Sequence, residues 1–328
     1  VAVHESSKKQ EPAAETGSSS VPKPLQTQLD LAPKAVQKSL QEIMLKPHPH
    51  WVGNGFHVFP VFDVKAFTES MSPFLMFDYA APKHFPPSQR KLGVGKHPHR
   101  GMETVTIAWQ GEVEHGDHLG NRDVIRAGDV QWMTAGRGIV HEEHHSAEFA
   151  KRGGTFEMCQ LWVNLPSRHK MVQASYQAIS GTQVPSVDLP GQVGRVRVIA
   201  GDYSGFAGPS RTFTPIDMWE VQLNKAGKSA DLVFPEGHNT IVFVKRGAAV
   251  VGSERSKLNE QDLALLGTQG RQVLVGALMD RTELLILSGE PISETIAASG
   301  PFVMNTQEEL SQAYEDYSRG MNGFGDAH

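Results

Sequence analysis

Two short groups of histidine and glutamate residues have the spacing of metal ligands. The first reads His-Pro-His at residues 97–99, and the second reads His-Glu-Glu-His-His at residues 141–145. Alternate residues of a β-strand point to the same face, so the two histidines of the first group would share a face. The same alternation would place His141 and Glu143 together. Two such strands side by side inside a barrel would bring three imidazoles and one carboxylate to a single point.

The predicted metal ligands are His97, His99, His141 and Glu143. Three nitrogen donors and one oxygen donor suit one divalent ion, Fe(II), Mn, Ni, Cu or Zn, and exclude thiolate chemistry. Four protein ligands on an octahedral ion would leave two positions for a substrate and O2. The alternative is solvated histidines on an outer strand face. That is the usual state of a lone histidine, but it explains two paired sets poorly.

Glu103 competes with Glu143 for the carboxylate position. It lies four residues after His99, so an unbroken strand would aim both side chains inward unless Gly101 interrupts that strand. Three roles therefore stay open for Glu103. It is a ligand, a partner that fixes the tautomer of a ligand histidine, or a buried acid near the substrate.

Residues 141–145 also match the H-E-x-x-H pattern of zinc proteases. That pattern requires a helix, on which residues i and i+4 share a face. The preceding run, residues 134–140, contains two glycines and the β-branched pair Ile139 and Val140, which make a poor helix start. A strand is therefore favoured over the protease interpretation.

Four further histidines are expected to lie at the surface or in loops rather than among the ligands. His48 and His50 flank a proline at the edge of the N-terminal segment, where no strand is predicted. His115 and His118 lie in a polar segment, residues 112–122, that we interpret as a hairpin loop at the surface or near the mouth of the pocket. None of these four histidines is predicted to bind the metal.

Composition excludes several classes of function. The chain has 328 residues, a net charge of −5 and one cysteine, Cys159, which we expect to be an inert buried thiol. It shows no basic stripe of the kind that binds nucleic acid directly. No apolar run approaches the roughly 20 residues of a membrane-spanning helix, and no signal peptide is recognised. We therefore expect a cytoplasmic protein.

From residue 51 onward, short apolar runs alternate with turn residues, which is typical of an all-β fold of barrels or sandwiches. A helix is expected at 33–45, a linker between two β domains at 180–190, and a C-terminal helix that starts with a capping box at Thr306 and packs on one barrel. The expected division of the chain is 1–50, a disordered extension; 51–180, a metal-binding β domain; 181–305, a second β domain without metal; and 306–328, the C-terminal helix and tail.

The two halves resemble one another in the positions of their strands. Residues 239–247 echo residues 103–111, and residues 259–263 echo residues 126–130. Only His238 remains near the first of these motifs in the second half, so its architecture is expected without ligands. Three large side chains in the first half are candidates either for the pocket wall or for the core: Met102, Trp132 and Met133.

Longer runs around the ligand groups resemble the pirin family, a branch of the cupin superfamily. The matching runs are residues 97–105, 128–143, 160–166 and 300–306. The resemblance implies two cupin domains, which are jelly-roll-like antiparallel barrels, with metal only in the first. It assigns the carboxylate ligand to Glu143, whereas cupins in general would take it from Glu103. Glu142 places a second acid directly beside the predicted ligand.

Family members are similar to flavonol dioxygenases of the quercetin 2,3-dioxygenase type. The resemblance therefore implies an iron-dependent enzyme that opens a flavonol or similar aromatic ring with O2, and in which Glu143 accepts a proton from the substrate. Other members imply an alternative, a nuclear iron redox sensor that binds a protein partner such as a transcription factor. A non-catalytic module stabilised by metal is the third interpretation. The basic residues considered for a partner surface are Arg122, Arg126, Arg137, Arg152, Arg168 and Lys170.

Overall fold

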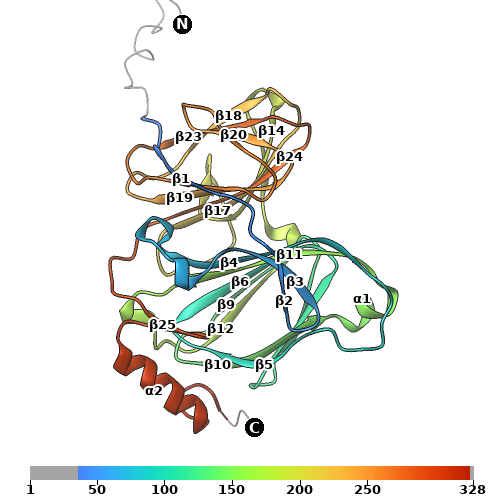
Figure 1. Ribbon diagram of the computed structural model, residues 1–328, viewed down its shortest axis with the longest axis vertical. Coiled ribbons are helices and arrows are strands. Elements are labelled where there is room, and N and C mark those ends of the chain that lie inside the picture. The colour runs from blue at the N-terminus through green and yellow to red at the C-terminus, as the bar shows by residue number, and fades with distance from the viewer. Residues whose placement is uncertain (1–35, 326–328) are drawn as a thin grey trace, which may run out of the picture. The chain divides into compact units, whose positions relative to one another are not determined.

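The computed structural model describes residues 36–325, which form two antiparallel β-barrels in succession along the chain (Figure 1). Within these residues, each barrel consists of a seven-stranded sheet and a four-stranded sheet. The predicted all-β class, with two barrels and a short C-terminal helix, is confirmed. No helix in the described part of the chain has both the length and the apolar character needed to cross a membrane.

The strands of each sheet are given in spatial order. In the first barrel the large sheet contains β12 (Ser175–Ile179), β9 (Val130–Thr134), β6 (Met102–Gln110), β11 (Gly154–Asn164), β4 (Phe74–Phe85), β3 (Phe56–Phe62) and β2 (His50–Val52). Its small sheet contains β5 (Gly93–His99), β10 (Ile139–His145), β7 (Glu112–Asp117) and β8 (Arg122–Arg126). In the second barrel the large sheet contains β1 (Leu40–Met44), β22 (Leu263–Leu266), β19 (Asn239–Arg246), β24 (Thr282–Gly289), β17 (Ile216–Leu223), β14 (Gly194–Ala200) and β13 (Ser186–Asp188). Its small sheet contains β18 (Ser229–Val233), β23 (Gln272–Ala277), β20 (Ala249–Val251) and β21 (Ser256–Leu258).

The remaining elements are two hairpins, two α-helices and several short 3-10 turns. The hairpins are β15 (Asp202–Tyr203) with β16 (Phe206–Ala207), and β25 (Ala297–Ser299) with β26 (Phe302–Met304). The helices are α1 (Ala147–Arg152) and α2 (Gln307–Ser318). The 3-10 turns are Val64–Ala66, Glu69–Met71, Ser167–His169, Gly181–Gln183 and Pro190–Gln192.

The central strands of the large sheet of the first barrel are buried on both faces, and alternate side chains along them lie in two different environments. Ile107 on β6 and Leu161 on β11 point out of the barrel into an apolar core shared with the second barrel. Residues of the opposite parity, Gln160 on β11 and Met76 on β4, face a cavity inside the first barrel. A shift of one residue in the pairing of a strand would turn its core side chains to the interior and its interior side chains to the core. The apolar side chains of the core therefore determine which residues face the interior.

The shared core joins the large sheets of the two barrels, and aromatic rings lie at its centre. Phe77 of β4 meets Phe243 of β19 edge to face, with ring centroids 4.8 Å apart. Tyr79 packs on the same Phe243 ring, with centroids 5.2 Å apart. Such edge-to-face pairs add stability beyond the area that they bury. The two barrels are therefore held by a continuous apolar interface.

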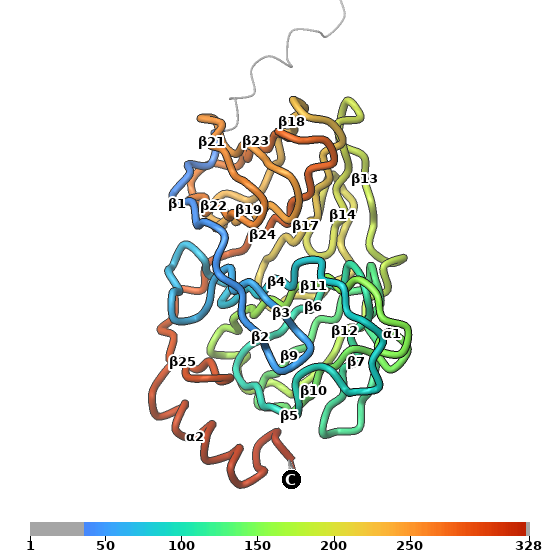
Figure 2. The backbone as a smooth tube through the Cα atoms, turned by 45° about the vertical axis from the view of Figure 1, so that its right-hand side comes forward, coloured from blue at the N-terminus to red at the C-terminus, as the bar shows by residue number. Residues whose placement is uncertain are grey.

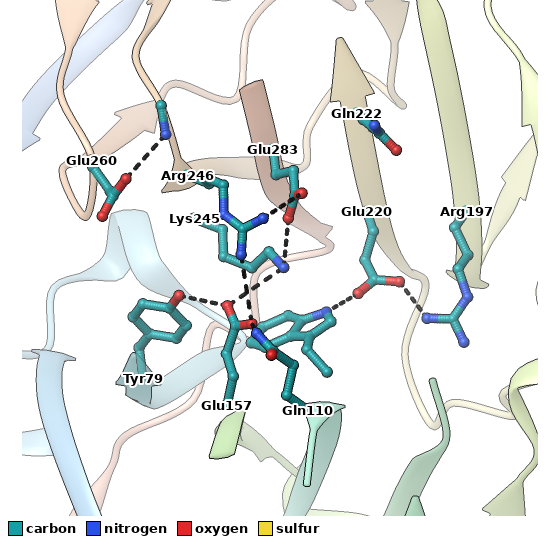
Figure 3. A network of polar contacts seen from close by, with 12 residues as sticks. Tyr79, Gln110, Glu157, Arg197, Glu220, Gln222, Lys245, Arg246, Glu260 and Glu283 are labelled. Carbon is teal, nitrogen blue, oxygen red and sulfur yellow. Dashed lines mark hydrogen bonds and ion pairs between the residues drawn. The ribbon is translucent and has the colours of Figure 1, made fainter. Parts of the chain in front are cut away.

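A polar network borders this interface (Figure 3). The carboxylate of Glu157, which is 1% exposed, accepts hydrogen bonds of 2.8 Å from the Tyr79 hydroxyl and from Gln110 Nε2. Lys245 of the second barrel lies 3.5 Å from the same carboxylate. Both Glu157 oxygens thus have partners, which is the condition under which a buried charge can be tolerated.

The N-terminal part of the described chain corrects one prediction. The helix expected at residues 33–45 is wrong, because Leu40–Met44 is strand β1, which runs beside β22 of the second barrel (Figure 2). Lys38 is buried just before it, and its Nζ donates to the carbonyl of His238 at 2.8 Å. A free strand edge offers backbone partners that outweigh a weak local helix preference. The expected disorder is therefore also wrong for residues 36–50, whereas residues 1–35 lie outside the described part.

The C-terminal helix begins where the capping box predicts. Thr306 caps α2 by accepting a hydrogen bond from the Glu309 N–H, and the Glu309 side chain accepts in return from the Thr306 backbone. Leu310 and Ala313 form the buried side of the helix, in a cluster that includes Val140 of β10. The predicted packing of this helix on one barrel is confirmed, and it is the first barrel that the helix contacts.

Arg100, which directly follows β5, anchors this C-terminal segment. Its guanidinium lies 2.8 Å from the Asp316 carboxylate and donates to the carbonyls of Arg137 at 2.6 Å and Asn322 at 3.0 Å. The side chains of Arg100 and Asp316 are 1% and 4% exposed. If one member of such a pair were removed, the other would be a buried charge without compensation.

We expect Asp316→Ala to lower the free energy of unfolding by about 3–5 kcal/mol, because Arg100 would be left unpaired. Urea unfolding of the full chain measures this loss. The matched control is Glu315→Ala on the same helix, whose ion pair with Arg319 is exposed and is worth less than about 1 kcal/mol. Equal losses in the two variants would contradict the assignment of Arg100 as a buried anchor.

Candidate metal centre

The four predicted ligands lie on β5 and β10, which are neighbours in the small sheet of the first barrel. In this antiparallel pair His97 lies directly opposite His141. The register then shifts, and Glu143 comes to lie opposite Val94. Residues 141–145 form a strand, as predicted, so the protease pattern is not on a helix.

Three of the predicted ligands converge, and the fourth adjoins them. One nitrogen each of His97, His99 and His141 lies within 4.8 Å of the others. The ring centroid of His141 is 4.3 Å from that of His97 and 4.8 Å from that of His99. A second group of donor atoms, also within 4.8 Å of one another, consists of Glu143, His141 and His115. Since His141 belongs to both groups, it links the carboxylate to the other two imidazoles.

The imidazoles have nitrogen atoms free for a metal. His99 and His141 are buried, and both nitrogens of His99 and Nε2 of His141 have no hydrogen-bond partner among the described residues. Burial, followed by the charge of neighbouring imidazoles, holds the pKa of both histidines well below the ordinary value. Nδ1 of His97 donates to the carbonyl of Gly95 at 2.8 Å, which leaves Nε2 as its free donor to a metal. Neutral imidazoles with orphaned nitrogens fit a metal cofactor, since unpaired buried polar atoms are otherwise costly.

The adjacent acids Glu142 and Glu143 take opposite sides of β10. Glu143 is 5% exposed, and its Oε1 accepts a hydrogen bond of 2.8 Å from Gln160 Nε2. Glu142 instead forms ion pairs with Arg122 at 3.0 Å and with Lys91 at 3.2 Å. Of the two acids, Glu143 is therefore the one that adjoins the histidines.

Glu103 faces away from the three imidazoles. β5 ends at His99, and Gly101 turns the chain at a φ of +81° before β6 begins, so the strand is not continuous. The carboxylate of Glu103 accepts a hydrogen bond of 2.8 Å from the Thr134 hydroxyl. Burial raises the pKa of Glu103 to about 7. Neither ligand group of the described residues contains Glu103.

The prediction that His115 lies in a surface loop is wrong, because this residue is buried on β7. It is 2% exposed and lies opposite Glu143 in the pairing of β7 with β10. Its Nε2 is hydrogen-bonded to Nδ1 of His141, which leaves Nε2 of His141 for a metal. Val113 and His115 are two residues apart, which is the spacing of a strand with one buried face. The polar composition of residues 112–122 led us to interpret the segment as a loop instead.

The other histidines stay outside both groups. His48 and His50 are exposed, and His118 is half-buried and bonds through Nδ1 to the backbone of Val140. His145 is buried, and its Nε2 donates to the carbonyl of Gly55 at 2.9 Å. Burial lowers the pKa of His145 to about 4. In the described chain, both groups of side chains that could hold a metal ion lie in the first barrel.

Comparison with known families identifies the architecture that carries this site. Residues 55–163 match the family model described as Pirin, and residues 218–323 match the model of the pirin C-terminal cupin domain. The chain belongs to the pirin family. The first match contains all four predicted ligands. Each barrel thus has its own family match, and the two matches together show that both barrels are cupin domains.

Relatives cover most of the chain. A Pseudomonas aeruginosa protein, provisionally named a quercetin 2,3-dioxygenase, is 50% identical over 271 residues, which are 83% of this chain and 93% of that protein. The crystal structure of a quercetin 2,3-dioxygenase from Acinetobacter baumannii is 46% identical with a TM-score of 0.85, and the match covers 88% of this chain and 99% of that one. Human pirin is 34% identical over 259 residues, which are 78% of this chain and 84% of human pirin.

A cavity of about 330 Å³ adjoins the predicted ligands of this pirin-family protein. His97, His99 and Glu143 form part of its wall. The rest of the wall is mostly apolar and includes Phe56, Val58, Met76, Val94, Met158, Trp162 and Pro301. Apolar walls with a few polar groups are typical of a small-molecule site.

The three large side chains considered for the pocket wall belong to the core instead. Trp132 lies in the core shared by the barrels, on the outer face of β9. Met102 packs against Leu75, and Met133 packs against Ile139. All three are fully buried and are not part of the wall of the cavity beside the histidines.

We expect His99→Ala to weaken metal binding by more than about 100-fold, which is the upper end of the loss caused by removing an outer partner of a ligand. Elemental analysis after metal loading and desalting measures bound metal per chain. The control is His48→Ala, which changes an exposed histidine of the other His-Pro-His run. A His99→Ala variant that retains the wild-type metal content would exclude His99 as a ligand.

We expect His115→Ala to weaken metal affinity about 10- to 100-fold, because His141 would lose the partner that fixes its ring and tautomer. Competition with a chromophoric chelator measures the affinity. His118→Ala provides the control, because His118 is close in sequence but belongs to neither ligand group. Unchanged affinity in His115→Ala would show that His141 does not depend on this contact.

Proposed function

We propose that this protein is a metal-dependent dioxygenase of the quercetin 2,3-dioxygenase type, which opens the ring of a flavonol or similar aromatic with O2. The observation that carries the proposal is the position of His97, His99 and Glu143 in the wall of an apolar cavity. The names of relatives at 50% and 46% identity support the same class of reaction. The substrate would be a small aromatic molecule that enters this cavity.

The ligands that we propose are His97, His99, His141 and Glu143, and the metal that we propose is Fe(II). Three imidazoles and one carboxylate suit iron, and they suit Mn, Ni, Cu and Zn as well. The family resemblance favours iron among these metals. When bound, the metal would supply Lewis acidity toward a flavonol hydroxyl and the means to engage O2.

Glu143 is the proposed acceptor of the proton from the flavonol hydroxyl. Gln160 holds Oε1 of Glu143 at 2.8 Å and so leaves the other carboxylate oxygen available. Trp162 Nε1 donates to Oε1 of Gln160 at 3.4 Å, which orients the amide group. This chain of contacts would keep Glu143 fixed while the apolar wall excludes water, so that the deprotonated flavonol meets O2 in a dry site.

The alternative of a transcription co-regulator requires a basic partner surface, and several of its candidate residues are already engaged. Arg122 forms ion pairs with Glu114 and Glu142, and Arg152 forms one with Glu112. Lys170 is 1% exposed, and its Nζ donates three hydrogen bonds within the fold. Lys170 is therefore excluded from such a surface, whereas the side chains of Arg122 and Arg152, which are 52% and 57% exposed, share their charge with neighbouring acids.

We expect the Fe(II)-loaded full chain to bleach the flavonol absorbance of quercetin in air and to release carbon monoxide. Glu143→Gln should lower the rate by about 100- to 10,000-fold, which is the usual contribution of a general base. Absorbance and carbon monoxide are measured together, and the loaded Mn, Ni, Cu and Zn forms are compared.

The matched control for that experiment is Glu142→Gln, one residue away on the opposite side of β10. This variant should turn over quercetin at the wild-type rate. If no metal form consumes quercetin, then the dioxygenase proposal fails for this substrate. If Glu103→Gln abolishes metal binding while Glu143→Gln does not, then the ligand assignment is wrong.

A further inference from the structure

Asp78 is an acidic residue in the wall of the cavity beside the predicted metal ligands. It lies on β4, where Phe77 and Tyr79 on either side belong to the core between the barrels. Strand alternation therefore turns Asp78 to the interior, together with Met76, which lines the same cavity. Its place is fixed by the register of a sheet that is buried on both faces.

The carboxylate of Asp78 has no role within the fold that would explain it. Among residues 36–325, no side chain or backbone N–H donates a hydrogen bond to it, and no Lys, Arg or His forms an ion pair with it. The residue is half-buried and lines the cavity, so part of its side chain is open to a molecule bound there. Burial, and to a lesser extent the charge of Asp63, raises the pKa of Asp78 to about 7. An acid without a partner whose charge is disfavoured by burial is typical of a functional site.

Asp78 is also close to the residues that hold Glu143. Its cross-strand partner on β11 is Gln160, and Gln160 donates the hydrogen bond of 2.8 Å to Glu143. Neighbouring strands lie about 4.8 Å apart. Asp78 is therefore one strand beyond Gln160, in the wall of the same cavity of about 330 Å³. A planar molecule in contact with the metal ligands would find Asp78, beside Gln160, as a further polar contact in a mostly apolar wall.

We propose that Asp78 determines specificity by binding a phenolic hydroxyl of the aromatic substrate, at a position other than the hydroxyl that meets the metal ligands. This inference rests on the proposed dioxygenase function and narrows its substrate class to aromatics with more than one hydroxyl group. The apolar wall would hold the rings, and Asp78 would orient them so that one hydroxyl reaches Glu143. A site that pairs a partly buried acid with a substrate hydroxyl disfavours analogues without that hydroxyl, because the acid is then covered without a partner.

Binding of two flavonols under anaerobic conditions tests the proposal without turnover. Quercetin has several hydroxyls, whereas 3-hydroxyflavone has only the hydroxyl next to the ring carbonyl. We expect Asp78→Leu in the metal-loaded full chain to weaken quercetin binding about 10- to 100-fold, the value of a hydrogen bond to a charged acceptor. Binding of 3-hydroxyflavone should be unchanged or tighter. Absorbance titration gives both dissociation constants.

Two further variants separate specificity from structure. Asp78→Asn keeps the shape and one acceptor oxygen, so its loss of quercetin affinity should be smaller than that of Asp78→Leu. It should melt at or above the wild-type temperature at pH 8, because a charge that burial disfavours has been removed. Met76→Leu changes an apolar residue of the same wall, two positions away on the same strand. It should change the affinities for both flavonols by the same factor.

The outcomes distinguish failure of this inference from failure of the proposed function. If Asp78→Leu leaves quercetin affinity unchanged, or lowers the affinities for both flavonols equally, then Asp78 does not determine specificity, although the dioxygenase proposal stands. If the metal-loaded wild type binds neither flavonol, then the proposed function fails and the role of Asp78 falls with it. A loss confined to quercetin, graded from leucine to asparagine, supports the proposal.

Discussion

The arrangement of this protein depends on a sheet that is buried on both faces. In β4, β6 and β11, one parity of side chains fills the core between the barrels, and the other parity faces the interior of the first barrel. Because alternation has a period of two, neither set can move without displacing the other. This constraint places Asp78 and Gln160 in the cavity wall and turns Glu103 away from it. The wall opposite the histidines is therefore set by contacts made outside the cavity.

The convergence of most of the proposed ligands could be predicted from the sequence, because the signals are local. His-x-His and His-x-Glu on strands put two donors on one face whatever the rest of the fold does. The choice between Glu103 and Glu143 could not be made from strand geometry alone, since it depends on the turn at Gly101. His115 was missed because a polar strand with one buried face has the composition of a loop. β1 was missed because its partner, β22, lies more than 200 residues away and only tertiary pairing selects strand over helix.

The interiors of the two barrels differ in how much of them is apolar. Its interior is filled by one apolar cluster, in which Trp219 and Phe234 stack with centroids 4.3 Å apart. The interior of the first barrel is divided between a smaller apolar cluster around Phe156 and the buried histidines. Burying imidazoles with orphaned nitrogens is destabilising unless a ligand binds them. The apolar second barrel and the shared core supply burial that can offset this cost, and bound metal would add stability in proportion to its occupancy.

The C-terminal segment adds a residue to the cavity wall and supports the backbone next to His99. Pro301 lies in the cavity wall, and Val303, two residues later, donates a backbone hydrogen bond of 3.0 Å to the carbonyl of Arg100. Arg100 follows His99 directly, and its guanidinium is fixed by Asp316 of α2. The backbone that carries His99 is therefore held from both sides, by the pairing of β5 with β10 and by the C-terminal segment. Ligand geometry needs this support, since a site whose surrounding residues leave it about 1 Å too loose binds poorly. The segment follows the whole second barrel in the sequence, so residues from both sides of that barrel in the chain support the site.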